Sequence, residues 1–195
     1  MTAQRGGRHT RLSVGEAIDP IELTTIDGTR IALPAADRLT HVQFRRFAGC
    51  PVCDLHLQSF VRRRVEIERA GLREILLFHS SAADLRIHAR DLPFLIVADP
   101  DKRLYVRFGV EAGVRALSDP RVWPHILRGV LRSLRRVIAG QQAMPPIIPE
   151  GGSFGLPADF LIGPDGTLLA CNYGEHAYDQ WSVDDVLELA AKNRG

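Results

Sequence analysis

Two cysteines separated by two residues are the part of this sequence best suited to chemistry. Cys50 and Cys53 stand in the stretch Gly-Cys-Pro-Val-Cys, where the apolar pattern of a strand gives way to that of an amphipathic helix. Unpaired backbone N–H groups and the helix dipole at a helix N-terminus stabilise a thiolate. The second sulfur lies on the same face of the first turn and can form a disulfide with the first. The spacing predicts dithiol redox chemistry, with zinc binding as the alternative.

Zinc needs more ligands than this pair supplies. His56 follows Cys53 at C-x-x-C-x-x-H spacing, and His41 is the other nearby candidate. The sequence lacks the second half of a zinc site, such as another C-x-x-C or an H-x-x-x-H. Redox chemistry is therefore favoured over zinc, and a purely structural cysteine pair stays open as a further alternative.

The composition is that of one ordinary globular domain. The chain has 195 residues, of which 45% are hydrophobic and 25% charged, so it can bury a full core. A net charge of +2 argues for neither nucleic acid nor a membrane surface as a partner. We expect a disordered tail at residues 1–12 and a single domain over residues 13–195, with an insertion at about residues 111–153.

The start of the chain and its cysteine content indicate where the protein works. The first residues are polar and basic, which predicts neither a signal peptide nor an anchor. No stretch approaches the length of a membrane span. Three cysteines cannot build a secreted disulfide scaffold. A cytoplasmic location is the expectation.

Strands and helices are expected to alternate around the cysteine pair. An Asp-Gly turn predicts a hairpin near the N-terminus, and a later strand runs directly into Cys50. The expected strands lie at residues 21–24, 30–33, 39–44, 74–79, 94–98, 159–162 and 167–171. The expected helices lie at residues 50–70, 81–90, 102–108 and 119–138 and from residue 182 to near the end. This order predicts an α/β fold with a mixed central sheet and helices on both faces.

The inserted helix at residues 119–138 is rich in arginine. Arg128, Arg132, Arg135 and Arg136 form a basic stripe opposite its apolar face. A solvated amphipathic helix, or one that packs across a homodimer, is the favoured interpretation. Docking to an acidic partner or an anionic surface is the alternative.

Four stretches together resemble the thioredoxin fold and, more narrowly, the peroxiredoxin-like (AhpC/TSA-type) family. They are residues 14–33 with the hairpin, residues 49–53 with the cysteine pair, residues 93–110, and residues 156–166. The resemblance covers roughly residues 14–191 apart from the arginine-rich helix. It implies a thioredoxin-like fold with an N-terminal hairpin and the arginine-rich helix as an insertion.

The resemblance implies a thiol-dependent oxidoreductase that reduces a peroxide or a disulfide without a bound cofactor. In the expected cycle Cys50 is the accessible nucleophile with the low pKa, and Cys53 resolves the intermediate to a Cys50–Cys53 disulfide. An external thiol system, thioredoxin or glutathione, would restore the dithiol. The first rival exchanges the roles, with Cys53 attacking the peroxide. The second is a non-catalytic thioredoxin-fold binding or redox-sensing module.

The peroxiredoxin motif is incomplete in this chain. Aligning the family's peroxidatic cysteine on Cys53 puts Arg46 at the proline of P-x-x-x-T-x-x-C and Cys50 at its threonine. The arginine expected before the later strand is Pro157. The usual peroxide-binding constellation is therefore absent, and the motif alone does not carry over peroxidase activity.

Three residues are expected to support the pair. Arg45 and Arg46 precede it, and a guanidinium near Cys50 would favour the thiolate. Alternation along a strand lets only one of the two face the sulfur, and two exposed loop arginines are the alternative. By resemblance, Pro157 should follow a cis bond and pack against the disulfide, the alternative being an ordinary trans proline.

Two further groups are predicted to be structural. Cys171 is expected to be a small buried hydrophobe, with a second redox partner as the alternative. A later loop is rich in groups that could hydrogen-bond a ligand, but packing over the sheet edge is favoured. Its residues are Tyr173, His176, Tyr178, Asp179 and Trp181.

Overall fold

The structure is a computed structural model that describes residues 11–47, 49–110, 156–176 and 178–193, and also residues 131, 134, 135, 138 and 139. The expected tail and insertion lie almost entirely outside the described residues, and so do Arg128, Arg132 and Arg136 of the predicted basic stripe. Three apolar positions of the predicted inserted helix are described and are exposed. They are Leu131, Leu134 and Ile138.

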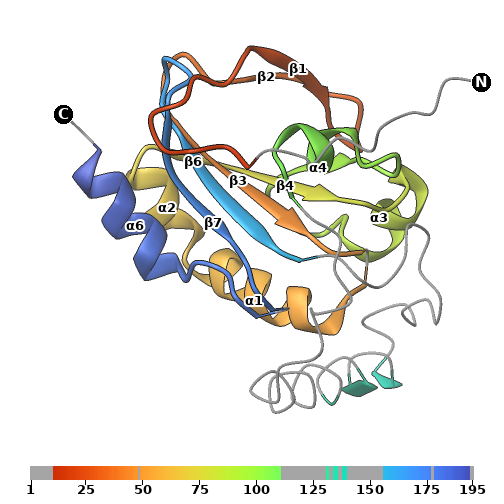
Figure 1. Cartoon of the computed structure of the whole chain (residues 1–195). Helices are drawn as coiled ribbons and strands as arrows, with labels where there is room; N and C mark the ends of the chain where they lie inside the picture. Colours follow the sequence, from red (N-terminus) through yellow and green to blue (C-terminus); the bar gives the residue numbers. More distant parts are fainter. Residues whose placement is uncertain are drawn as a thin grey trace, which may run out of the picture.

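The described strands form a two-stranded hairpin and a five-stranded mixed sheet (Figure 1). The strands are β1 Ile21–Thr24, β2 Arg30–Leu33, β3 Leu39–Arg45, β4 Leu72–Phe78, β5 Leu95–Ala98, β6 Ala158–Ile162 and β7 Leu168–Tyr173. The large sheet has the order β5-β4-β3-β6-β7, with β3, β4 and β5 parallel and β6 and β7 antiparallel to their neighbours. The predicted mixed sheet and N-terminal hairpin are confirmed.

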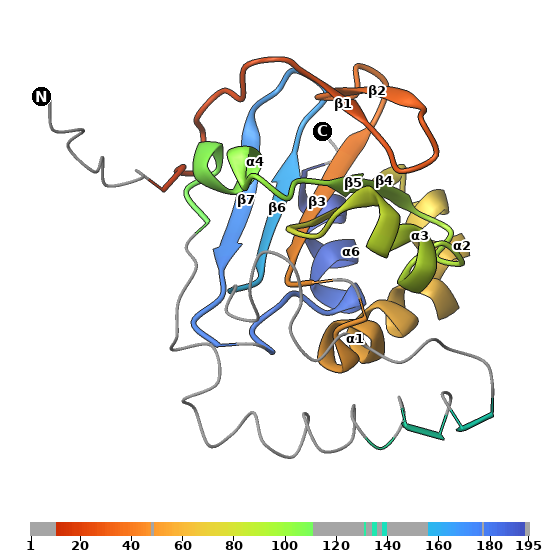
Figure 2. The ribbon, with the colours of Figure 1, turned by 90° about the vertical axis from the view of Figure 1, so that its right-hand side faces the viewer.

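Helices cover both faces of the sheet, as predicted. They are α1 Pro51–Arg62, α2 Arg64–Arg69, α3 Ala82–His88, α4 Arg103–Arg107 and α6 Val183–Lys192. Figure 2 shows α4 and the hairpin on one side of the sheet and α1, α2 and α6 on the other. In the part of the chain that the structure describes, no helix is long and apolar enough to cross a membrane.

The strand that leads into the cysteine pair is buried on both faces. On the α4 side, Phe44 meets the rings of Tyr105 and Phe160 edge-on, with ring centroids 4.9 and 5.5 Å away. Such edge-to-face packing adds to the stability that burial provides. On the other side, beneath α1 and α6, β3 carries His41 and Arg45, which are also fully buried. One buried face of this strand is therefore apolar and the other polar.

The helix after the cysteine pair begins where expected but is interrupted. Cys50 is its N-cap and Pro51 its first residue, as the sequence predicts. The single helix expected at residues 50–70 breaks at Arg63, which has a φ of −108°. Its guanidinium donates to the carboxylates of Glu66 in α2 and Asp184 in α6. These bonds connect the break to the last helix.

Side-chain caps begin two of the remaining helices. Ser81 accepts a hydrogen bond from the backbone N–H of Asp84, as expected, although α3 ends at His88 and not at residue 90. Ser182 and Asp185 form a reciprocal capping box at the start of α6. These polar residues act locally, which explains why the sequence predicts both helix starts.

Candidate active site

The two thiols lie at the carboxyl end of β3, in the turn that leads into α1. Gly49 adopts a φ of 79°, a left-handed conformation that favours glycine. The Cys50 N–H donates to the Phe47 carbonyl oxygen at 3.2 Å, which closes the turn. The Asp54 N–H then donates to the Cys50 carbonyl oxygen at 2.9 Å and starts the helical hydrogen bonding. Cys50 and Cys53 thus share the first turn of α1.

Both thiols are reduced and buried, each with 2% of its surface exposed. Phe47 and Tyr178 pack against them. Arg46 is also buried, and its Nη2 atom donates to the Cys50 sulfur at 3.0 Å. A buried guanidinium beside a sulfur favours the charged form of the thiol pair, because few other charges screen it.

The two thiols differ in their pKa. A hydrogen bond from Cys50 and the charge of Arg46 outweigh burial and lower the pKa of Cys53 to about 5. Burial and the neighbouring Cys53 raise the pKa of Cys50 well above its usual value. Cys50 is no more accessible than Cys53, and the lowered pKa falls on Cys53, so the identity of the nucleophile stays a prediction.

Arg45 and Arg46 point in different directions, as strand alternation predicts. Arg46 faces the sulfurs, whereas Arg45 ends β3 on the opposite side, beneath α1. Neither is an exposed loop arginine, because both side chains are buried. Arg45 still has some electrostatic effect at the site, since its charge helps to lower the pKa of Cys53.

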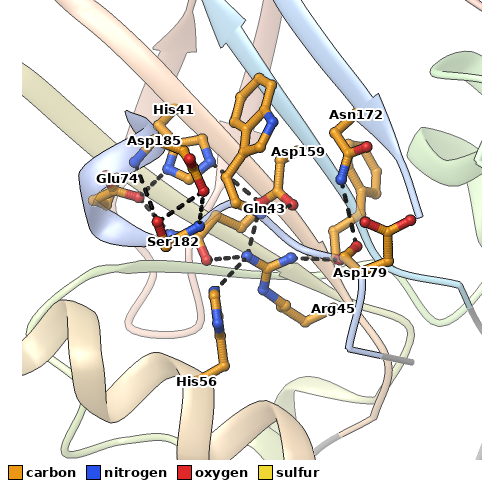
Figure 3. Close-up of polar contacts among 12 residues, drawn as sticks. His41, Gln43, Arg45, His56, Glu74, Asp159, Asn172, Asp179, Ser182 and Asp185 are labelled. Carbon is orange, nitrogen blue, oxygen red and sulfur yellow. Dashed lines mark hydrogen bonds and ion pairs between the residues drawn. The ribbon is translucent and has the colours of Figure 1, made fainter. Parts of the chain in front are cut away.

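Arg45 is held by a buried polar network next to helix α1 (Figure 3). Its Nη2 atom donates to Asp159 Oδ1 of β6 at 2.7 Å and also to the side-chain oxygen of Gln43. The Asp159 Oδ2 atom accepts from the backbone N–H of Trp181 at 3.2 Å. The charge of Arg45 offsets the burial of Asp159, and the pKa of Asp159 falls well below its usual range.

His41 extends this network along β3. Its Nδ1 atom lies 2.8 Å from Glu74 Oε2, and its Nε2 atom lies 3.3 Å from Asp159 Oδ1. Burial alone would lower the pKa of His41, but the two carboxylates raise it to about 9. A protonated imidazole can donate to both oxygens at once. Two cations, His41 and Arg45, thus balance two anions, Glu74 and Asp159.

His56 belongs to the network and not to a ligand set with the thiols. Its Nε2 atom lies 3.5 Å from the Arg45 Nη2 atom, and its ring packs against Phe60. Burial and the charge of Arg45 lower the pKa of His56 to about 3, so the ring is neutral. Over the described ranges, no three His, Cys, Asp or Glu side chains group closely enough to hold a metal ion.

Tyr105 occupies the other side of the same sheet end. Its hydroxyl donates to the carbonyl oxygens of Arg45 and Leu77, the latter at 3.1 Å. Burial raises the pKa of Tyr105, and the negative charges of Asp99 and Cys53 raise it further.

Pro157 and Cys171 are the remaining proline and cysteine to which the sequence analysis assigned a role. Pro157 is buried and immediately precedes β6, at the end of the sheet where β3 finishes. The Leu156–Pro157 peptide bond is trans. Among the described residues, the cis peptide bond is Leu33–Pro34. The predicted cis bond is therefore wrong, and trans is the usual form for a proline that leads into an extended strand. Cys171 is only partly buried: it packs against the α4-side core, and its sulfur lies 3.8 Å from the Leu12 carbonyl oxygen.

The sequence interpretation missed the buried network and Tyr178. The alternation of His41, Gln43 and Arg45 with apolar residues was visible, but such a pattern is also typical of a strand with one solvated face. The sequence favours sheet-edge packing over ligand binding for the loop that holds Tyr178, whereas Tyr178 packs against the thiols. No local signal distinguishes these possibilities, because both depend on residues distant in the sequence.

Comparison with known proteins supports the fold. No family model and no curated protein matches the sequence. Among solved structures, the chain is similar to peroxidoxin BcpB from Mycobacterium tuberculosis, at 17% identity and a TM-score of 0.64 over 95% of this chain and 100% of that one. It is also similar to a peroxiredoxin-like protein from Aquifex aeolicus, at 12% identity and a TM-score of 0.63 over 95% and 90% of the two chains. Peroxiredoxin Q from Xanthomonas campestris matches at 16% identity and a TM-score of 0.60 over 89% and 90%. The chain therefore has the thioredoxin-like fold of the peroxiredoxins.

Proposed function

We propose that this protein is a thiol peroxidase that reduces a small hydroperoxide with Cys53 and Cys50. The observation that carries the proposal is the buried dithiol at the start of α1, where Arg46 contacts Cys50 and the pKa of Cys53 is lowered to about 5. A thiol that is ionised at neutral pH is a nucleophile. A purely structural pair or a passive binding module would need neither the buried guanidinium nor the thiolate.

The proposed reaction has two covalent steps and a reduction. The Cys53 sulfur attacks one peroxide oxygen, an S–O bond forms as the O–O bond breaks, and the leaving oxygen takes a proton from water. The Cys50 thiol then attacks the Cys53 sulfenic acid, forming the disulfide and releasing water. An external dithiol or two thiols, from a thioredoxin or glutathione system, reduce the disulfide and are oxidised in turn. No bound cofactor takes part.

The burial of the thiols favours a small peroxide over a protein disulfide as the oxidant. With 2% of each cysteine exposed, and with Phe47 and Tyr178 packed over the pair, a bulky disulfide does not reach the sulfur without movement of these rings. A hydroperoxide has only two oxygens to place at the reacting centre. The peroxiredoxin-like fold supports the same choice.

We also propose a domain organisation and a cellular location for this protein. Strand β6 pairs directly with β3, which supports a single domain over residues 13–195 with residues 111–153 inserted between neighbouring parts of the fold. A cytoplasmic location fits a dithiol that an external thiol system must keep reduced. Whether the working protein is a homodimer stays a prediction that molecular mass in solution would test.

Single cysteine variants test the proposal. Steady-state rates are measured with hydrogen peroxide, an organic hydroperoxide and a model disulfide, using a thioredoxin–thioredoxin reductase couple. We expect Cys53→Ser to abolish peroxide turnover. Cys50→Ser should keep one fast turnover that leaves a Cys53 sulfenic acid, which dimedone traps, but lose sustained turnover.

Cys171→Ser is the matched control and should behave as the wild type. Full peroxide turnover by both Cys50→Ser and Cys53→Ser would rule out the proposed cycle. A wild-type rate that is higher for the model disulfide than for either peroxide would instead favour disulfide exchange.

A further inference from the structure

A buried histidine beside Arg46 has a side chain without hydrogen-bond partners among the described residues. His79 is 1% exposed, and neither of its ring nitrogens has a partner among the described residues. The Nε atom of the buried Arg46 is likewise unpartnered. Buried polar atoms are almost always hydrogen-bonded, because leaving them unpaired is costly. Unpaired groups on two neighbouring residues, one of which donates to the Cys50 sulfur, point to a polar ligand that completes them.

The sheet register places His79 beside Arg46. The parallel strands β3 and β4 end with the pair Arg45 and Phe78, so Arg46 and His79 are the next residues on each strand. The backbone N–H of His79 donates to the Arg46 carbonyl oxygen at 3.3 Å. By alternation, both side chains leave on the α4 side of the sheet, opposite to Arg45 and Phe78.

Two contacts connect this corner to the sulfurs. The His79 ring meets the Tyr105 ring edge-on, with centroids 5.8 Å apart, and the Tyr105 hydroxyl donates to the carbonyl oxygen of Arg45, the residue before Arg46. Arg46 donates to the Cys50 sulfur. His79 and Tyr105 therefore lie against the chain at Arg45 and Arg46, and Arg46 reaches the Cys50 sulfur.

The protonation state of the His79 ring suits a neutral ligand. Burial and the positive charges of Lys102 and Arg46 lower the pKa of His79 to about 4. At neutral pH the ring then carries one N–H donor and one acceptor nitrogen. A hydroperoxide matches this pair, because its oxygens accept hydrogen bonds and its O–H donates one.

We propose that His79 is a catalytic residue that, together with Arg46, binds the hydroperoxide and donates a hydrogen bond to the oxygen that leaves. The inference rests on the proposed peroxidase function and names the groups that replace the threonine and arginine missing from the peroxiredoxin motif. His79 neither gains nor loses a proton in this role. The attacked oxygen keeps its hydrogen in the sulfenic acid, and the leaving oxygen, charged as the O–O bond breaks, takes its proton from water.

The test compares His79→Phe, which keeps a ring against Tyr105 but has no ring nitrogen, with His79→Asn, which keeps a donor and an acceptor. Each variant is reacted with hydrogen peroxide in single-turnover mode and, separately, with iodoacetamide. Alkylation by iodoacetamide needs the thiolate but no oxygen leaving group. We expect His79→Phe to slow the peroxide reaction at least about 10-fold and to change alkylation less than about twofold. His79→Asn should recover part of the peroxide rate.

Stability provides a second readout, because removing unpaired buried nitrogens should not destabilise the fold. We expect the Tm of His79→Phe to equal or exceed that of the wild type. An unchanged peroxide rate in His79→Phe, or equal losses with peroxide and iodoacetamide, would overturn the proposal. A wild-type peroxide rate no faster than that of free cysteine would overturn the proposed function itself, and this role of His79 with it.

Discussion

At the scale of single residues, Arg46 adds to the hydrogen bond between the two thiols in lowering the pKa of Cys53. Its guanidinium is buried and donates to the Cys50 sulfur at 3.0 Å, and its charge lowers the pKa of Cys53. Replacement by the neutral Arg46→Gln should raise the pKa of Cys53, because a nearby opposite charge lowers the pKa of an acid by about 1–3. The pH dependence of thiolate ultraviolet absorbance measures the shift, and alkylation followed by peptide mass analysis assigns it to Cys53.

Arg86→Gln is the matched control for this prediction. Arg86 lies on α3 and donates to the Ile26 carbonyl oxygen, and its substitution should leave the pKa of Cys53 unchanged. Equal pKa values for Cys53 in wild type and Arg46→Gln would contradict the role assigned to Arg46.

At the scale of secondary-structure elements, Asp99 holds the start of α4 and so positions Tyr105. Its two oxygens accept from the backbone N–H groups of Arg103, Leu104 and Tyr105 at 2.9, 2.8 and 3.2 Å. Loss of a carboxylate cap of this kind costs about 1–2 kcal/mol. We expect Asp99→Ala to lower the free energy of unfolding by that amount, measured by urea denaturation, and to slow peroxide turnover as Tyr105 shifts.

The neighbouring Asp101→Ala separates this cap from a general charge effect. Asp101 forms only an exposed ion pair with Arg103 among the described residues, at 3.2 Å, and exposed pairs contribute about 0–1 kcal/mol. Similar losses of stability in Asp99→Ala and Asp101→Ala would show that capping is not the cause.

At the scale of the whole molecule, the buried network couples stability to pH. The pKa of His41 rises from 6.5 to about 9 on folding, so the folded state favours its protonated form. Its stabilising contribution is fully present below pH 6.5 and is lost as the pH rises through 9. The pKa of Asp159 is lowered, so its contribution is present above its unfolded value and lost on acidification.

The test measures the free energy of unfolding of the wild type and of His41→Gln across a pH series. Because the thiols titrate over part of the same pH range in both proteins, the difference between the two free energies isolates the contribution of His41. Breaking a buried ion network by removing one partner costs about 3–5 kcal/mol. We expect a difference of that size below pH 6.5 that shrinks as the pH approaches 9. The exposed Lys192→Gln, whose side chain pairs with Glu188, should give a difference that stays flat with pH. A flat difference for His41→Gln would contradict the protonated network.

Much of the local structure could be predicted from the sequence because its causes are local. The spacing of Cys50 and Cys53, Pro51 at the first helical position and the capping box at Ser182 act within one turn of helix. The periodicity of apolar residues predicted the order of strands and helices, and with the motifs it led to the thioredoxin-like fold. These signals involve neighbours in the chain and do not depend on its path in space.

The tertiary structure alone decided how the site works. The His41, Gln43 and Arg45 side chains are buried because α1 and α6 cover that face of the sheet, and a strand pattern cannot say what covers it. The order of the two thiol pKa values depends on the hydrogen bond between the sulfurs and on Arg46, which turns toward them after β3 ends. The sequence by itself therefore determined where the reactive dithiol lies. Only the fold decided on which thiol the lowered pKa falls and which buried groups surround the pair, because desolvation and charge act through space.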